Sequence, residues 1–97
     1  MLRYLALMLL TVPAVAADIE AGRRKAAICG ACHGTDGIAV VKSYPDLAGK
    51  KAADLELALK GYRDGSRRHA LMSPMARGLS DQDISELAAY FSSLPAD

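Results

Sequence analysis

The sequence feature that most constrains this chain is the pentapeptide CGACH, which places two cysteines and a histidine side by side, from Cys29 to His33. The chain has 97 residues and no other cysteine. A disulfide between residues three apart closes almost no loop, so it would stabilise the fold little by the loop-entropy model. The motif leaves three hypotheses: a redox-active cysteine pair, half of a zinc site, or the attachment site of a c-type haem.

The rest of the sequence separates these hypotheses. A structural zinc site takes four Cys or His ligands, and after His33 only His69 remains. A thioredoxin-like pair belongs in a strand–helix context, and no such alternation is visible. C-x-x-C-H is the attachment signature of c-type haem, because two thiols at this spacing can each form a thioether to one porphyrin edge. The sequence therefore predicts one covalent haem c with its iron, bound through Cys29 and Cys32, with His33 as an axial ligand.

The N-terminal segment MLRYLALMLLTVPAVAADIE has the pattern of a secretory signal peptide. Arg3 supplies the charged region, a short apolar run follows, and small residues surround an A-x-A-like cleavage site. The pattern predicts a signal peptide over residues 1–17, cleaved after Ala16 or Ala17. A membrane span needs about 20 apolar residues, more than this segment offers. We therefore expect a periplasmic domain over residues 18–97, with no stable membrane insertion.

Size and charge limit what that domain does. Removing residues 1–17 takes away one arginine and leaves 80 residues with 11 basic and 11 acidic side chains. A neutral balance argues against a nucleic-acid binder, which normally carries a basic excess. A single domain this small is marginally stable unless something else fills its core, and a bound cofactor would do so.

The periodicity of apolar residues predicts an all-α fold with three main helices. The first covers about residues 18–32 and the second about residues 52–63, because apolar side chains recur there at helical spacing. The third follows Ser80, which has the character of an N-cap, with Asp83 three residues later in a near capping box.

Two long segments between these helices are predicted to be loops. Residues 34–49 are rich in turn formers, and residues 65–79 are interrupted by Pro74. Loops of this length in a small domain call for an explanation, and wrapping around a ligand is one. The second loop also holds the candidates for a sixth iron ligand: Met72 and Met75, then His69. Methionine ligation raises the reduction potential of a haem, but spacing alone does not rank the two methionines.

Five segments carry a resemblance to a known family: CGACHGTDG, YPDLAGK, GYRDGSRR, LMSPMARGLSDQDI and LAAYFSSL. In their order and spacing they are similar to the class I c-type cytochromes over nearly all of residues 18–97. In detail the chain resembles one haem domain of the bacterial diheme cytochromes c, and the cytochrome subunit of flavocytochrome c sulfide dehydrogenase. With a single CxxCH, it is expected to be a monohaem protein.

The resemblance implies roles for individual residues. The family's distal methionine stands seven residues before the leucine that precedes the last helix, which is Leu79 here, so Met72 is implied as the ligand. The Pro45 carbonyl is expected to accept the Nδ1–H of His33, which fixes the ring and raises its basicity. Gly22 is expected to let the first helix cross the last one closely, with Tyr90 packed at the crossing.

The charge pattern adds one further candidate. Residues 50–77 hold seven basic side chains and three acidic ones. Within this basic segment, Arg67 or Arg68 is expected to neutralise a haem propionate.

Three functions compete. The leading one is a periplasmic, non-enzymatic carrier of single electrons in a respiratory chain, with an oxidase, a reductase or a reaction centre as partner. The alternative is a haem subunit in a heterodimer with a catalytic partner such as a flavoprotein sulfide dehydrogenase. The third is a haem sensor or peroxidase with an open iron, which requires that Met72 is not a ligand.

Overall fold

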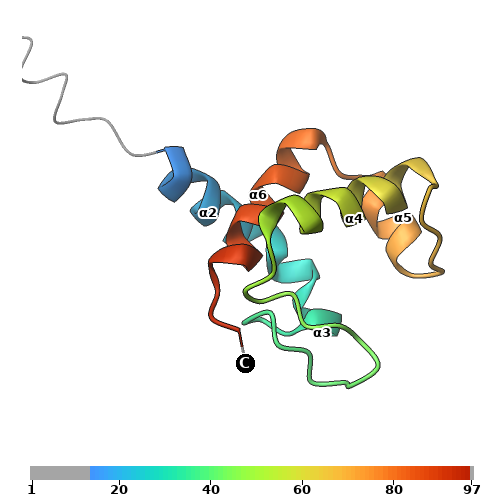
Figure 1. The fold of residues 1–97 in the computed structure, drawn as a ribbon, viewed down its shortest axis with the longest axis horizontal. Coiled ribbons are helices and arrows are strands. Elements are labelled where there is room, and N and C mark those ends of the chain that lie inside the picture. The colour runs from blue at the N-terminus through green and yellow to red at the C-terminus, as the bar shows by residue number, and fades with distance from the viewer. Residues whose placement is uncertain (1–13, 97) are drawn as a thin grey trace, which may run out of the picture.

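The computed structural model describes residues 14–96 as an assembly of helices (Figure 1). The elements are α2 (Ala14–Lys25), the 3₁₀ helix η1 (Ala26–Ile28), α3 (Gly30–His33), α4 (Ala52–Asp64), α5 (Met72–Arg77) and α6 (Asp81–Ser93). No strand occurs within residues 14–96. The predicted all-α fold is therefore confirmed.

Most of the predicted signal peptide lies outside the described residues, because residues 1–13 are not among them. The two expected cleavage positions, after Ala16 or Ala17, fall in the first turn of α2. The division into residues 1–17 and 18–97 stays a prediction. No helix within residues 14–96 is both long and apolar enough to cross a membrane.

The first and last helices, α2 and α6, pack against each other, and α4 packs against α6 and α5. Gly22 lies buried at the crossing. A Cβ atom placed on Gly22 would lie 2.7 Å from the carbonyl carbon of Glu86 and 2.8 Å from Cβ of Tyr90. Real side chains do not pack this tightly against a backbone, so only glycine allows this approach of the two helices.

A lysine spans the same crossing. Lys25 Nζ lies 2.6 Å from Asp83 Oδ1 and also forms an ion pair with Glu86, so the last residue of α2 binds two carboxylates of α6. The hydrogen bond from Lys25, followed by that from the Ser80 backbone, lowers the pKa of Asp83 to about 2. The pKa of Glu86 is lowered as well, with Lys25 again the largest cause.

The N-terminus of α6 has the capping box that the sequence predicts. The backbone N–H of Asp83 donates to Ser80 Oγ at 3.0 Å, and the backbone N–H of Ser80 donates to Asp83 Oδ2 at 3.0 Å. Arg63 of α4 also binds the start of α6, because its guanidinium donates to the Leu79 carbonyl at 3.1 Å and to Asp81 Oδ1 at 2.6 Å.

The apolar core is small. Among the residues whose burial the structure describes, half of the ten buried apolar residues are alanines, and Ile84 is the only large side chain with less than 2% of its surface exposed. The main cluster joins η1, α4 and α6, with Ile19 of α2 packed against it; its buried members are Ala26, Leu55, Leu87, Ala88, Tyr90 and Phe91. Several large apolar side chains elsewhere are exposed: Ile28, Val40, Val41, Leu57, Leu71 and Met75.

Two local differences separate the structure from the sequence prediction. The segment expected to be irregular over residues 65–79 contains α5, and Pro74 is the third residue of that helix. A proline in the first turn removes an N–H that would have no intrahelical partner anyway, so it does not interrupt the helix. The predicted helix over residues 18–32 is divided by the turn of η1 and resumes as α3, which ends at Gly34 with φ 81°.

Candidate haem-binding site

The short helix α3 presents the CGACH motif. The backbone N–H of Cys29 donates to the Ala26 carbonyl at 2.9 Å, and that of His33 donates to the Cys29 carbonyl at 2.9 Å. Residues three and four apart on a helix are neighbours on one face. One helical turn therefore places Cys29, Cys32 and His33 side by side. Both cysteines are half-buried free thiols, and burial, with a smaller effect from Cys32, raises the pKa of the Cys29 thiol.

The imidazole of His33 is oriented by the loop that follows it. His33 is buried, with 7% of its surface exposed, and its Nδ1 lies 2.8 Å from the Pro45 carbonyl oxygen. A carbonyl oxygen only accepts, so this contact requires the proton on Nδ1. The lone pair of Nε2 then remains available for a metal ion, with the partner carbonyl increasing its basicity.

The position of Pro45 depends on hydrogen bonds inside the loop. The backbone N–H groups of Leu47 and Ala48 both donate to the Gly37 carbonyl, at 2.7 and 3.1 Å. Asp46 Oδ1 accepts from the backbone N–H of Ala39 at 2.7 Å. Sequence reasoning did not single out Asp46, although an aspartate beside a proline in a turn-rich segment is the residue type that binds local backbone N–H groups.

A second contact links the site to α6. The Tyr90 hydroxyl donates to the Thr35 carbonyl at 3.1 Å, and Thr35 lies two residues after His33. Tyr90 is buried, with 8% of its surface exposed. The same tyrosine thus packs beside Gly22 and holds the chain directly after the predicted ligand; the sequence indicates the packing role but not the hydrogen bond.

The three candidates for the sixth ligand differ in environment. Met72 is half-buried and is the first residue of α5, whereas Met75 has 41% of its surface exposed. His69 is exposed, and its Nδ1 accepts from the backbone N–H groups of Leu71 at 3.2 Å and Met72 at 3.4 Å. Nδ1 of His69 is therefore engaged in holding the start of α5. The assignment of Met72 as ligand stays a prediction.

Arg67 lies next to α4. Its backbone N–H donates to the Gly61 carbonyl at 3.1 Å, and its side-chain methylenes approach the space beside Gly61. The side chain is exposed. Its proposed contact with a haem propionate stays a prediction.

The residues at the site suit a covalent haem better than a zinc ion. Within residues 14–96 no three His, Cys, Asp or Glu side chains come together as a metal-binding group. What the site does offer is two thiols and one oriented imidazole on a single helical turn. Exposed apolar side chains adjoin two of the predicted haem-binding residues in the sequence, with Ile28 next to Cys29 and Leu71 next to Met72. A porphyrin needs such apolar surface around it, because its ring is largely hydrophobic.

The fold and this site together define a small all-α protein that carries a covalent haem. The sequence matches the cytochrome c family over residues 19–95. It is 53% identical over 81 residues to cytochrome c-554(548) from Halomonas halodenitrificans, covering 80% of this chain and 98% of that protein. The chain belongs to the cytochrome c family. The cofactor of this family is a covalent haem c with its iron, and Cys29 and Cys32 stand here in the CxxCH arrangement.

Cytochrome c4 proteins are longer relatives. The chain is 44% identical over 78 residues to cytochrome c4 from Pseudomonas aeruginosa, covering 80% of this chain and 39% of that protein. The crystal structure of reduced cytochrome c4 from Pseudomonas stutzeri superimposes with a TM-score of 0.75 at 41% identity, covering 79% of this chain and 45% of that one. The chain thus spans less than half of these relatives, which confirms its resemblance to one domain of a longer cytochrome.

The predicted resemblance to a sulfide dehydrogenase subunit is also confirmed. The chain is 36% identical over 66 residues to the cytochrome subunit of sulfide dehydrogenase from Chlorobaculum tepidum, covering 68% of this chain and 59% of that subunit.

Proposed function

We propose that this protein is a periplasmic, monohaem electron carrier of the cytochrome c4 type, which passes single electrons between redox proteins. The observation that carries the proposal is the buried His33, whose Nδ1 lies 2.8 Å from the Pro45 carbonyl at the end of a CxxCH turn. That contact leaves Nε2 to ligate iron in a fixed orientation. Membership of the cytochrome c family supports the same function.

The residues of this chain would divide the work as follows. Cys29 and Cys32 would hold the cofactor through thioethers, and His33 and Met72 would bind its iron through an imidazole nitrogen and a thioether sulfur. The bound haem contributes a reversible Fe(III)/Fe(II) couple. With His33 and Met72 both binding the iron, no open site for a substrate would remain, so the chain would transfer electrons without making or breaking substrate bonds. The contact with the Pro45 carbonyl would hold the His33 imidazole in one orientation.

Absorption spectroscopy tests this proposal directly. We expect the exported protein, produced in a host that attaches haem c, to show a reduced haem c spectrum and the weak far-red band of methionine ligated to Fe(III). Met72→Ala should abolish the far-red band, and Met75→Ala, which removes a nearby and more exposed methionine, should retain it. The loss of the band in Met75→Ala alone would reassign the ligand, and carbon monoxide binding to the reduced wild type would indicate an open iron.

A second candidate is supported by one observation, the similarity to a sulfide dehydrogenase cytochrome subunit. Under this alternative the chain is the haem subunit of a heterodimer and accepts electrons from a catalytic partner, such as a flavoprotein. Size-exclusion chromatography of the native protein separates the two candidates. A free carrier elutes as a monomer, and a subunit elutes earlier together with its partner.

A further inference from the structure

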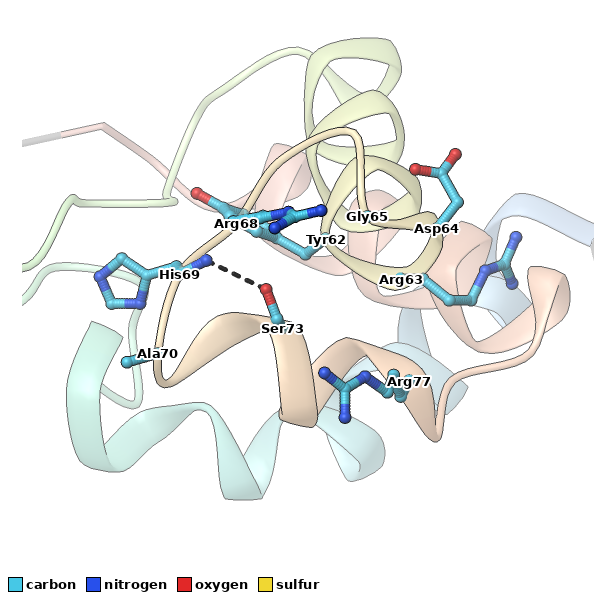
Figure 2. A pocket seen from close by; sticks show the side chains of 9 residues that line it. All are labelled: Tyr62, Arg63, Asp64, Gly65, Arg68, His69, Ala70, Ser73 and Arg77. Carbon is cyan, nitrogen blue, oxygen red and sulfur yellow. Dashed lines mark hydrogen bonds between the residues drawn. The ribbon is translucent and has the colours of Figure 1, made fainter.

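An open pocket of about 590 Å³ lies between the end of α4 and α5 (Figure 2). Its lining includes neither the two cysteines nor His33. Groups that donate hydrogen bonds dominate its polar lining. They belong to Arg63, Arg68, His69, Ser73 and Arg77. With three arginines and Asp64 as the one acidic side chain, the lining carries a formal charge of +2, with His69 counted as neutral.

Two of the three arginines have no carboxylate partner in the part of the chain that the structure describes. Arg63 donates to Asp81 and to the Leu79 carbonyl, so its charge is already compensated. Across residues 14–96, neither Arg68 nor Arg77 lies within 4.0 Å of a carboxylate oxygen. Figure 2 shows their side chains on either side of Ser73.

The remaining polar groups also favour an anion. Ser73 Oγ accepts a hydrogen bond from the His69 backbone N–H at 3.0 Å, which leaves the hydroxyl hydrogen free to donate. Asp64, the acidic residue of the lining, accepts from the backbone N–H of Ser66 at 2.9 Å. Its carboxylate points away from Ser73 in Figure 2, so it does not compete for the two free arginines.

We propose that this pocket binds a small, doubly charged oxyanion of the sulfate or phosphate class between Arg68 and Arg77, with the Ser73 hydroxyl as a third donor. The planar guanidinium matches the oxygens of such anions with paired N–H groups. Ser73 and Arg77 are four residues apart and therefore share one face of α5. Met72 lies about 100° away around the same helix, so the pocket is on a different face from the predicted iron ligand.

One consequence rests on the function proposed above. A bound anion would connect the segment before α5, through Arg68, to the helix that begins with Met72. Negative charge near the iron stabilises Fe(III) relative to Fe(II), so occupation of the pocket should lower the reduction potential. This coupling is separate from binding itself and can fail independently.

Nuclear magnetic resonance of the reduced, ¹⁵N-labelled holoprotein tests the site. Sodium sulfate should cause saturable shifts of backbone amides within residues 66–77, and sodium chloride at equal ionic strength should not. Arg68→Ala and Arg77→Ala should each weaken sulfate binding about fivefold, as expected for an exposed charge-assisted contact. Arg77→Lys should fall between Arg77→Ala and the wild type, because lysine retains the charge but lacks the paired donors.

Arg24→Ala is the matched control, since Arg24 is an exposed arginine on α2 outside the pocket, and it should bind sulfate like the wild type. Equal shifts with chloride, or unchanged affinity in both arginine variants, would overturn the proposal. It would also be overturned if sulfate gave no shifts because a haem propionate occupies the two arginines. Saturable binding without a change in potential would support the site and contradict only its coupling to Met72.

Discussion

The α2–α6 crossing and the segments around His33 are held together in different ways. At the crossing, direct side-chain packing, an ion-pair cluster and a capping box fix two regular helices. Around His33 the structure depends on single hydrogen bonds to loop carbonyls, and large apolar side chains remain exposed. The difference indicates that the crossing is stabilised by the chain alone, whereas the segments around His33 depend on the cofactor for much of their stability.

The largest expected effect comes from preventing attachment of the cofactor. The double variant Cys29→Ala/Cys32→Ala should carry no covalent haem, as measured by haem staining after denaturing electrophoresis. Because any ligand that binds only the folded state stabilises it, we expect faster hydrogen exchange throughout the variant. The increase should be larger in residues 34–51 and 65–77 than in α2 and α6. An equal increase in both regions would show that the segments around His33 depend on the cofactor no more than the crossing does.

Adding a single methyl group at Gly22 tests whether the close approach of α2 and α6 stabilises the fold. Gly22→Ala should lower the free energy of unfolding by about 3 kcal/mol, because the added Cβ would overlap the backbone at Glu86 and force the helices apart. Chemical denaturation of the holoprotein measures this effect. Gly78→Ala is the matched control, since a Cβ at Gly78 meets no atom within 4 Å. Similar stability losses in the two variants would show that the close approach is not the cause.

Tyr90 connects the two regions, so its hydroxyl tests their coupling. Tyr90→Phe should keep the ring packing but remove the hydrogen bond to the Thr35 carbonyl, and we expect a loss of about 1 kcal/mol in unfolding free energy. Tyr62→Phe serves as the control, because the Tyr62 hydroxyl forms no hydrogen bond within residues 14–96. A reduction potential that changes in Tyr90→Phe but not in Tyr62→Phe would show that the crossing also influences the His33 segment.

Features set by local sequence patterns could be predicted, whereas contacts between residues far apart in the chain could not. The helices of the crossing follow from apolar periodicity and from the Ser80–Asp83 pair, which are local signals. The CxxCH motif is also local, because one helical turn sets its geometry. The ion pairs of Lys25 join residues about 60 positions apart, and no local pattern indicates that partnership.

Two features near the site, helix α5 and the hydrogen bond of Asp46, were not predicted from the sequence, for other physical reasons. Helix α5 was missed because a proline normally argues against a helix, and its tolerance in the first turn depends on where the helix begins. The role of Asp46 depends on how the loop folds back on Ala39, seven residues earlier. The sequence shows that a turn former is present there but not which N–H group it binds.

The smallest effect concerns the charge cluster of the crossing at low pH. Lys25 and the cap lower the pKa of Asp83 to about 2 in the folded protein, below its ordinary value of 3.8. A depressed pKa contributes stability above the unfolded-state value, and that contribution is lost as pH falls through the folded-state value. Stability should therefore decrease between about pH 4 and pH 2.

Lys25→Met should flatten this pH dependence in acid titrations followed by circular dichroism. Arg24→Met removes a neighbouring charge outside the cluster and should leave the pH dependence unchanged. An identical acid transition in Lys25→Met would show that the ion pairs contribute nothing to the stability of the crossing, which packing and the capping box would then supply.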